Sequence, residues 1–247
     1  MNNTDEAVIK SNLAFVKQRI YTACAKAGRP PEDVRLLLAT KTVPAEKIQI
    51  AIDAGETLIG ENKVQELNKK IPLLTDSHKN IHFIGHLQSN KIKDVLKYAD
   101  CIESVDRLSL AEALNKKLAT DNRTIDIFIQ VNTSFEESKF GVHPDEALSL
   151  IKAVNAFPHL RIKGLMTIGL FDADHEKVRP SFSLLRQIRD ASIAQSLLAA
   201  DAKELSMGMS GDMETAIAEG ATIVRVGTAI FGKRMYPDSY YWNEQRG

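Results

Sequence analysis

The chain has 247 residues, of which 44% are hydrophobic and 26% are charged. Lysine plus arginine and aspartate plus glutamate number 32 each, so the formal net charge at pH 7 is zero. Proteins that bind nucleic acids or anionic membranes usually carry an excess of basic residues. This chain has no such excess, so we expect neither as a partner. No apolar run approaches the roughly 20 residues that span a bilayer, and positions 1–6 do not resemble a targeting peptide. These features predict a cytoplasmic protein, in which the isolated Cys24 and Cys101 are small core residues.

The first predicted element is a helix over about 4–27. Apolar residues recur at helical spacing from Val8 to Ala23, and Gly28 ends the pattern. Eight short apolar runs follow and predict strands over 35–41, 57–62, 81–86, 101–105, 126–132, 160–168, 204–209 and 223–226. Between them, helical patterns occupy 44–54, 62–70, 106–118, 144–157 and 174–199. We expect Pro180 to kink or restart the last of these helices.

Alternating strands and helices are typical of two architectures, a (β/α)8 TIM barrel and a doubly wound open sheet. The count of eight strands favours the α/β barrel, preceded by one extra helix. No linker or low-complexity tract marks a boundary, so we predict a single domain over 1–247. Within it the barrel occupies about 34–234, and a tail with several aromatic residues follows over 235–247.

Two glycine-rich turns follow the last two predicted strands, at 206–212 and 225–228. In TIM barrels, phosphate commonly binds to the loops after strands 7 and 8. Glycine lets backbone N–H groups approach an anion closely, and Ser210 and Thr228 each add a hydroxyl donor. Either hydroxyl alone is typical of a helix N-cap. Because two such loops lie on adjacent strands, we favour a phosphate site that includes Ser210, Gly227 and Thr228.

Lys41 ends the first predicted strand, where a solvated strand terminus is the ordinary interpretation. In a closed barrel the first strand pairs with the eighth, which brings Lys41 near Gly227 and Thr228. A partly desolvated amine has a lowered pKa and reacts more readily with an aldehyde. We therefore hypothesise that Lys41 forms a Schiff base with an aldehyde that carries a phosphate.

Arg225 lies in the last strand between Val224 and Val226. If both valines face the helices, Arg225 points into the barrel, where an unpaired guanidinium is very unfavourable. Its partner is then either a ligand atom or a barrel carboxylate such as Glu61 or Glu103.

The remaining titratable residues are less informative. Glu61 and Glu66 fit the start of a helix as well as catalysis. His82 and His86 share one face of the third predicted strand, but two histidines at this spacing are a weak metal signal. We predict no metal site.

Several longer stretches resemble the YggS/PROSC family of pyridoxal phosphate homeostasis proteins, which are similar to the barrel domain of alanine racemase. The matching stretches lie between about residues 8 and 234, at 39–42, 60–66, 82–91, 131–132, 138–142, 164–168 and 205–233. The resemblance implies that pyridoxal phosphate is the cofactor. The family pattern has a tryptophan or a similarly bulky residue where this chain has Ile81, a difference that puts no catalytic feature in doubt.

The resemblance also implies a role for each matching residue. Lys41 would form the internal aldimine, and Ser210, Gly227 and Thr228 would hold the phosphate. Arg225 would face the pyridine nitrogen, and Asn62 and Met166 would line the ring.

An arginine opposite the pyridine nitrogen keeps its own proton, so the ring is a weak electron sink. Racemases that share this arrangement complete their site with a tyrosine from a second domain, for which we expect no room after the last strand. We therefore expect a monomer that binds pyridoxal phosphate reversibly, maintains its cellular pool and turns over little or no substrate. Apo-enzymes that require the cofactor are the expected macromolecular partners.

Two alternatives remain open. A weak amino-acid racemase would use Lys41 and one of the C-terminal tyrosines as its bases. A phosphosugar enzyme would use the same phosphate loops with Lys41 as its Schiff-base lysine.

Overall fold

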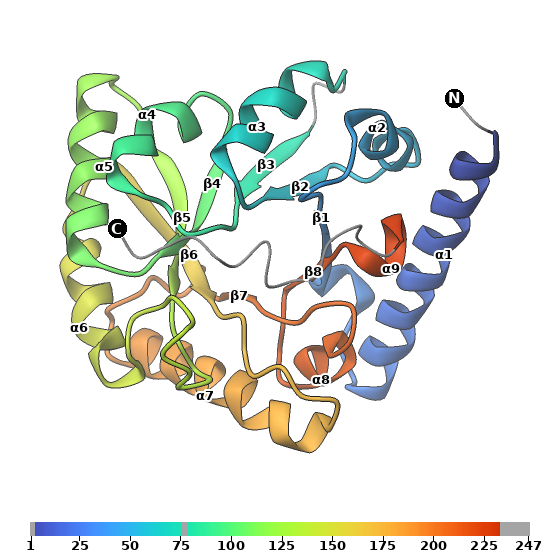
Figure 1. Cartoon of the computed structure of the whole chain (residues 1–247). Helices are drawn as coiled ribbons and strands as arrows, with labels where there is room; N and C mark the ends of the chain where they lie inside the picture. Colours follow the sequence, from blue (N-terminus) through green and yellow to red (C-terminus); the bar gives the residue numbers. More distant parts are fainter. Residues whose placement is uncertain (1–2, 76–78, 233–247) are drawn as a thin grey trace.

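Eight parallel strands form a closed barrel in which the first strand pairs with the last (Figure 1). This computed structural model describes residues 3–75 and 79–232. The strand order follows the chain order, so the predicted TIM barrel is confirmed and the open sheet is excluded. The strands are β1 (Arg35–Ala39), β2 (Leu58–Glu61), β3 (Asn80–Phe83), β4 (Cys101–Val105), β5 (Ile125–Gln130), β6 (Leu160–Met166), β7 (Glu204–Ser206) and β8 (Ile223–Val226).

Helices surround the barrel, as the sequence predicts. They are α1 (Asn3–Lys26), α2 (Ala45–Asp53), α3 (Val64–Lys70), α4 (Ile92–Val95), α5 (Leu108–Thr120), α6 (Pro144–Val154), α7 (His175–Ala194), α8 (Met213–Ala218) and α9 (Thr228–Phe231). The N-terminal helix α1 packs against α2, α8 and α9 on the outside of the barrel (Figure 1). Across this contact, the side-chain amide of Asn12 donates a 2.9 Å hydrogen bond to the carbonyl oxygen of Ile230.

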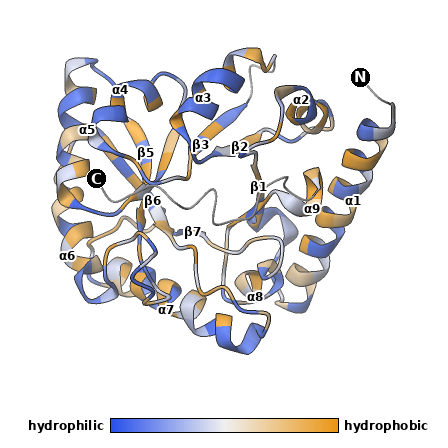
Figure 2. Ribbon diagram, viewed as in Figure 1, coloured by the Kyte–Doolittle hydropathy of each residue, from blue (hydrophilic) through white to orange (hydrophobic). Residues whose placement is uncertain are grey.

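Successive side chains of each strand point alternately into the barrel and toward the helices, and they form two separate apolar cores. The inner core fills the barrel and consists of Leu37, Leu58, Cys101, Phe128, Met166 and Ile223. The outer core lies between barrel and helices and includes Leu36, Leu38, Val224 and Val226. Burial on both faces explains why some strands carry consecutive apolar residues, such as Leu36, Leu37 and Leu38 of β1. Figure 2 shows that hydrophilic residues also occur along the strands. Arg225 therefore belongs to the barrel interior, because both neighbouring valines face the helices.

The register between β1 and β8 determines which residues meet at the barrel mouth. Leu37 is paired with Arg225, and Leu38 with Val226. The residues that follow β1 and β8 therefore leave the barrel side by side. This register brings Lys41 and Gly227 to one side of the same opening, as the sequence predicts.

Several strands end earlier than predicted. The first ends at Ala39 because Thr42 has a left-handed φ of 62°, which turns the chain out of the extended conformation. Lys41 thus lies in a turn beyond the strand. The prediction that His82 and His86 share a strand face is wrong, because β3 ends at Phe83 and His86 lies in the following loop.

The last long helix also differs from its prediction. Pro180 neither restarts nor ends α7, which is continuous from His175 to Ala194. Pro180 is the sixth residue of the helix, so the i−4 carbonyl that it cannot bond belongs to Glu176, an exposed residue in the first turn. The aromatic tail at 235–247 lies outside the described residues.

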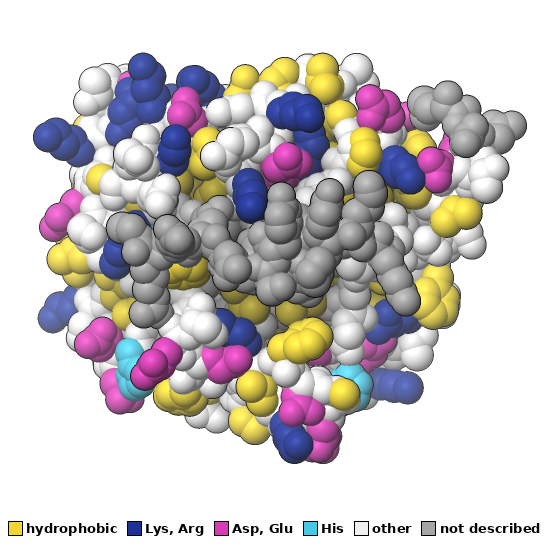
Figure 3. All heavy atoms as spheres, viewed as in Figure 1, with side chains coloured by type: hydrophobic (Ala, Val, Ile, Leu, Met, Phe, Trp, Pro, Cys, Tyr) yellow, Lys and Arg dark blue, Asp and Glu magenta, His cyan; other side chains and the backbone are white. Residues whose placement is uncertain are grey.

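No helix within 3–75 and 79–232 is both long enough and apolar enough to cross a membrane. On the face seen in Figure 3, acidic and basic side chains are intermixed. This mixture agrees with the formal net charge of zero.

Candidate functional site

A cavity of about 480 Å³ opens beyond the carboxyl ends of the strands. It is lined by Ala39, Lys41, Asn62, Ile84, Gly85, His86, Gln130, Lys139, Phe140, Met166, Ile168, Phe171, Met209, Ser210, Gly211, Arg225, Gly227 and Thr228. All seven site residues predicted from the sequence are in this set. Among these described residues, Lys41, Lys139 and Arg225 carry positive charge, and none is an aspartate or glutamate. The cavity therefore suits an anion.

Lys41 follows β1 in a turn whose backbone is held at several points. The N–H of Val43 donates to the carbonyl oxygen of Thr40 at 2.9 Å, and Lys70 Nζ donates to the same oxygen at 2.8 Å. The left-handed Thr42 is uncommon for a β-branched residue and indicates local strain of about 1–2 kcal/mol. The surrounding hydrogen bonds maintain this turn and keep the half-buried Lys41 at the cavity.

The loops after β7 and β8 meet on the same side of the cavity. Thr228 Oγ1 lies 3.3 Å from Ser210 Oγ, so the two predicted hydroxyls are neighbours. Gly227 immediately precedes α9, and Asp212 immediately precedes α8. The first N–H groups of a helix lack intrahelical acceptors, which leaves backbone donors beside these hydroxyls.

Gly227 is required for a reason that the sequence did not indicate. A Cβ at this position would lie 2.6 Å from the carbonyl oxygen of Ala39. The absent side chain therefore lets β8 pack closely on β1, rather than only admitting an anion. This close contact keeps the phosphate loop next to Lys41.

Arg225 is 5% exposed and donates to two groups inside the barrel. Its Nη1 donates to Ser206 Oγ at 2.9 Å, and its Nη2 donates to the carbonyl oxygen of Thr167 at 2.7 Å. Burial lowers the pKa of the guanidinium, and the nearby charges of Glu103 and Asp212 oppose that shift. Two of the guanidinium's five N–H donors are thus used on protein groups, and the residue lines the cavity.

Glu103 is the carboxylate that compensates Arg225, through Ser206. Ser206 Oγ donates to Glu103 Oε2 at 2.5 Å, and His82 Nδ1 lies 2.5 Å from Glu103 Oε1. All three side chains are buried. Although burial raises the pKa of Glu103, the hydrogen bond and charge of His82 and the charge of Arg225 lower it further, so the net shift is downward. Of the two carboxylates predicted as partners of Arg225, Glu103 is connected to it, but only indirectly, through Ser206.

Glu61 has a different partner from those predicted. It forms an ion pair with the buried Lys70 at 2.5 Å and accepts a 2.6 Å hydrogen bond from Thr40 Oγ1. Glu66 lies 3.1 Å from the same ammonium group. Burial raises the pKa of Glu61 and the charge of Lys70 opposes this rise. Both glutamates are therefore structural partners of Lys70 beneath the Lys41 turn.

Asn62 and Met166 also line the cavity. Met166 belongs to the inner core and is 1% exposed. Asn62 Oδ1 is buried and has no hydrogen-bond partner among the described residues. Gly85 packs tightly against the Asn62 backbone, where a Cβ would lie 2.0 Å from the carbonyl oxygen. An unsatisfied acceptor at the cavity wall is suited to a ligand donor.

The loop between β5 and α6 supplies residues that the sequence did not place in the site. Lys139 Nζ donates to the carbonyl oxygen of Gly169 at 2.6 Å and forms an ion pair with Glu136. The Phe140 ring stacks on His86, with centroids 3.8 Å apart. Gly141 in this loop has a positive φ of 129°, a conformation that favours glycine. In the sequence, the signal for this loop was the resemblance of residues 138–142 to the family. 

Other titratable groups do not form a metal centre. Within 3–75 and 79–232, no group of three or more histidine, cysteine, aspartate or glutamate side chains could hold a metal ion. His82 bonds Glu103, whereas His86 Nδ1 lies 3.7 Å from Asp106 Oδ2. The two histidines thus have separate surroundings.

Comparison with known proteins gives a consistent result over most of the chain. The model for the N-terminal domain of alanine racemase matches residues 7–235. A pyridoxal phosphate homeostasis protein of Aquifex aeolicus is 43% identical over 224 residues, which cover 91% of this chain and 97% of that protein.

Two solved structures have the same architecture. An unknown protein from Bifidobacterium adolescentis superposes with a TM-score of 0.89 at 41% identity, covering 94% of this chain and 97% of that one. PipY of Synechococcus elongatus PCC7942, solved with pyridoxal phosphate bound, gives a TM-score of 0.78 at 32% identity. That match covers 91% of this chain and 100% of PipY.

Proposed function

The chain belongs to the alanine racemase N-terminal domain family and, within it, to the pyridoxal phosphate homeostasis proteins, and from this we propose that it binds pyridoxal 5′-phosphate (PLP) reversibly. In this proposal the protein helps to maintain the cellular PLP pool and has little or no catalytic turnover. The PLP-bound relative supports the choice of cofactor.

One observation carries the proposal. An amine, two hydroxyls and a buried arginine line a single cavity that contains no carboxylate among its described lining residues. A carboxylate there would repel a phosphate, and a cavity without the amine could not bind an aldehyde covalently. The residues present fit both ends of PLP.

Each lining residue then has a separate task. When bound, PLP supplies an aldehyde that condenses with primary amines. Lys41 would hold it as a Schiff base, with the aldehyde oxygen leaving as water. Ser210, Gly227 and Thr228 would donate hydrogen bonds to the phosphate.

The ring would lie between the other lining residues. Met166 would provide an apolar contact to the ring, and the unsatisfied Asn62 Oδ1 would accept a hydrogen bond from a polar ring substituent. Arg225 would face the ring nitrogen. Its guanidinium keeps its own proton, so the nitrogen remains a hydrogen-bond acceptor and the ring withdraws electrons weakly. In this proposal, low turnover results from this weak electron withdrawal together with the lack of a tyrosine among the described residues that line the cavity.

An amino-acid racemase is the second candidate. Its supporting observation is Lys139, a second amine that lines the same cavity as Lys41 and could serve as the second base. The C-terminal tyrosines predicted for that role lie outside the described residues.

We propose further that the protein acts in the cytoplasm as a monomer and that PLP-requiring apo-enzymes receive its cofactor. The free and buried Cys24 and Cys101 support a reducing compartment. Because the chain has no basic excess, we propose neither a nucleic acid nor a membrane as a partner.

The test is equilibrium dialysis against PLP, followed by transfer to an apo-aminotransferase and by assays with alanine and serine. We expect one PLP per chain, reactivation of the apo-enzyme and turnover far below about 1 s⁻¹. The Lys41→Ala variant should lose tight binding, whereas Lys116→Ala, at an exposed position on α5, should not. Racemisation at about 1 s⁻¹ or more that depends on Lys41 would favour the racemase, and absent PLP binding would refute both candidates.

A further inference from the structure

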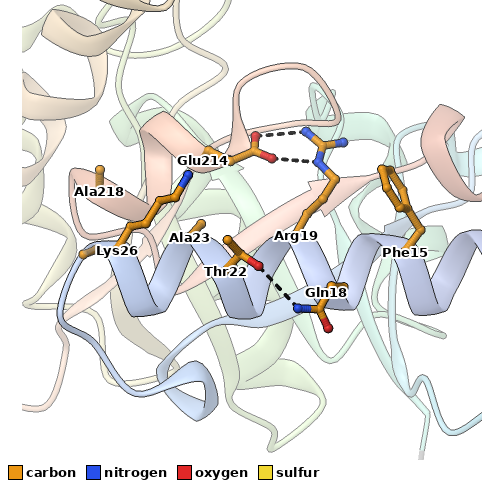
Figure 4. Close-up of a pocket in the computed structure, with 9 residues that line it drawn as sticks. Phe15, Gln18, Arg19, Thr22, Ala23, Lys26, Glu214 and Ala218 are labelled. Carbon is orange, nitrogen blue, oxygen red and sulfur yellow. Dashed lines mark hydrogen bonds and ion pairs between the residues drawn. The ribbon is translucent and has the colours of Figure 1, made fainter.

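Arg19 of α1 connects the outside of the barrel to the loop after β7. Its Nε and Nη2 donate to the two carboxylate oxygens of Glu214 at 2.7 and 2.9 Å, as Figure 4 shows at the pocket between α1 and α8. Nη2 also donates to the carbonyl oxygen of Ser210 at 3.0 Å. Arg19 does not line the cavity, yet it holds the backbone of a residue that does.

The bond from Arg19 reaches the central peptide of a tight turn. The N–H of Asp212 donates to the carbonyl oxygen of Met209 at 3.2 Å, and Asp212 Oδ1 accepts from the N–H of Met209 at 2.5 Å. Residues 209–212 therefore form a β-turn with Ser210 and Gly211 at its centre.

The peptide bond between Ser210 and Gly211 is trans, so its N–H and C=O groups point in opposite directions. Arg19 binds the carbonyl oxygen from the α1 side. The N–H of Gly211 consequently points away from the Arg19 guanidinium. Both Ser210 and Gly211 line the cavity.

A β-turn has a second state in which its central peptide is rotated by about 180°. Here that state would aim the Ser210 carbonyl oxygen at the cavity and remove the Gly211 N–H from it. The rotated state needs a positive φ at the third turn residue, which glycine adopts readily. Gly211 is not among the glycines with positive φ, so the structure holds the first state.

We propose that Arg19 is a positioning residue for the phosphate, because it fixes the Ser210–Gly211 peptide with its N–H toward the cavity. This inference rests on the proposed function. Without Arg19 the turn populates the rotated state, whose carbonyl dipole repels an anion. Glu214 orients the guanidinium through the two-point ion pair, a geometry that a lysine could not reproduce.

Arg29 offers a matched control for Arg19. Its Nη1 donates to the carbonyl oxygen of Ile217 at 2.9 Å, at the other end of α8. Arg29→Met therefore removes an arginine that also holds the α8 segment, but it leaves the 209–212 turn untouched.

The experiment compares dissociation constants of Arg19→Met, Arg29→Met and the wild type for PLP, inorganic phosphate and pyridoxal, with melting curves of each variant. We expect Arg19→Met to bind PLP and inorganic phosphate about tenfold more weakly, and to bind pyridoxal as the wild type does. Arg29→Met should match the wild type for all three ligands. Glu214→Gln should also weaken phosphate binding, by a smaller factor. This variant tests the same role if Arg19→Met does not fold.

Gly211→Ala supplies the rescue. A Cβ there meets no protein atom within 4 Å, and alanine disfavours the positive φ of the rotated turn. Arg19→Met with Gly211→Ala should recover part of the affinity for inorganic phosphate. Unchanged phosphate affinity in Arg19→Met, equal weakening for pyridoxal, or no recovery in the double variant would overturn the role of Arg19. Wild-type protein that binds inorganic phosphate but not PLP would instead refute the proposed function, and phosphate affinities would still decide the role of Arg19.

Discussion

Lys70 Nζ lies 2.8 Å from the carbonyl oxygen of Thr40, the residue immediately before Lys41. Lys70 is 4% exposed and is compensated by Glu61, which is fully buried. The ion pair between Glu61 of β2 and Lys70 of α3 therefore fixes the backbone just after β1, through the hydrogen bond from Lys70 to Thr40. The position of the cavity amine depends on this pair.

Replacement of Lys70 by methionine should destabilise the protein strongly. It leaves the buried Glu61 carboxylate without its ammonium partner, a change that typically costs about 3–5 kcal/mol of unfolding free energy. Urea denaturation at pH 7 measures the loss. The double variant Lys70→Met with Glu61→Gln removes both charges and should recover part of the lost unfolding free energy. If the unfolding free energy of Lys70→Met lay within about 1 kcal/mol of the wild-type value, the ion pair would not be important for stability.

Glu103 should make the stability of the protein sensitive to acid. Burial raises its pKa, but His82, Arg225 and Ser206 lower it further, so the folded state favours the ionised form. A depressed pKa contributes stability above the unfolded pKa of about 4.5, and that contribution disappears as pH falls through the lower folded pKa.

Glu103→Gln should therefore be less stable at pH 7 and should lose less stability than wild type between about pH 5 and pH 3. Urea midpoints measured across this range test the expectation. Glu112→Gln, at an exposed position on α5, is the control and should retain the wild-type slope. An identical slope in Glu103→Gln would contradict the assigned pKa direction.

Gly227 and Gly211 line the same cavity but should respond differently to alanine. At Gly227 the new Cβ would lie 2.6 Å from the carbonyl oxygen of Ala39, and such overpacking costs about 1–3 kcal/mol. At Gly211 no protein atom lies within 4 Å, so the cost should stay within about 0.5 kcal/mol. The melting temperatures of the ligand-free Gly227→Ala and Gly211→Ala variants test this difference. Equal melting temperatures would contradict the close contact between Gly227 and Ala39.

Much of the site could be predicted because two simple geometric constraints apply. Side chains alternate between the two faces of a strand, and a closed barrel pairs the first strand with the last. Two valines on either side of Arg225 were enough to place it inside the barrel. Closure then brought Lys41 to Gly227 without any knowledge of side-chain contacts. These inferences depend only on order along the chain and on which face a residue occupies.

The contacts within the site could not be predicted in the same way. Parity indicates that Arg225 and Glu103 both face inward, but it does not show that Ser206 lies between them. Lys70 was placed on a helix pattern, and nothing in its spacing indicated that its side chain reaches back to Thr40. Lys139 enters the cavity through a loop whose path is determined by tertiary hydrogen bonds such as the one to Gly169.

The most direct test of the account is the identity of the lysine that binds PLP. The purified protein is incubated with PLP, reduced with borohydride and digested, and the modified peptide is identified by mass spectrometry. We expect the pyridoxyl group on Lys41 in the wild type and its loss in Lys41→Ala, with Lys139→Ala labelled as the wild type. Labelling that resides on Lys139, or that persists unchanged in Lys41→Ala, would contradict the assignment of Lys41 as the cofactor-binding amine.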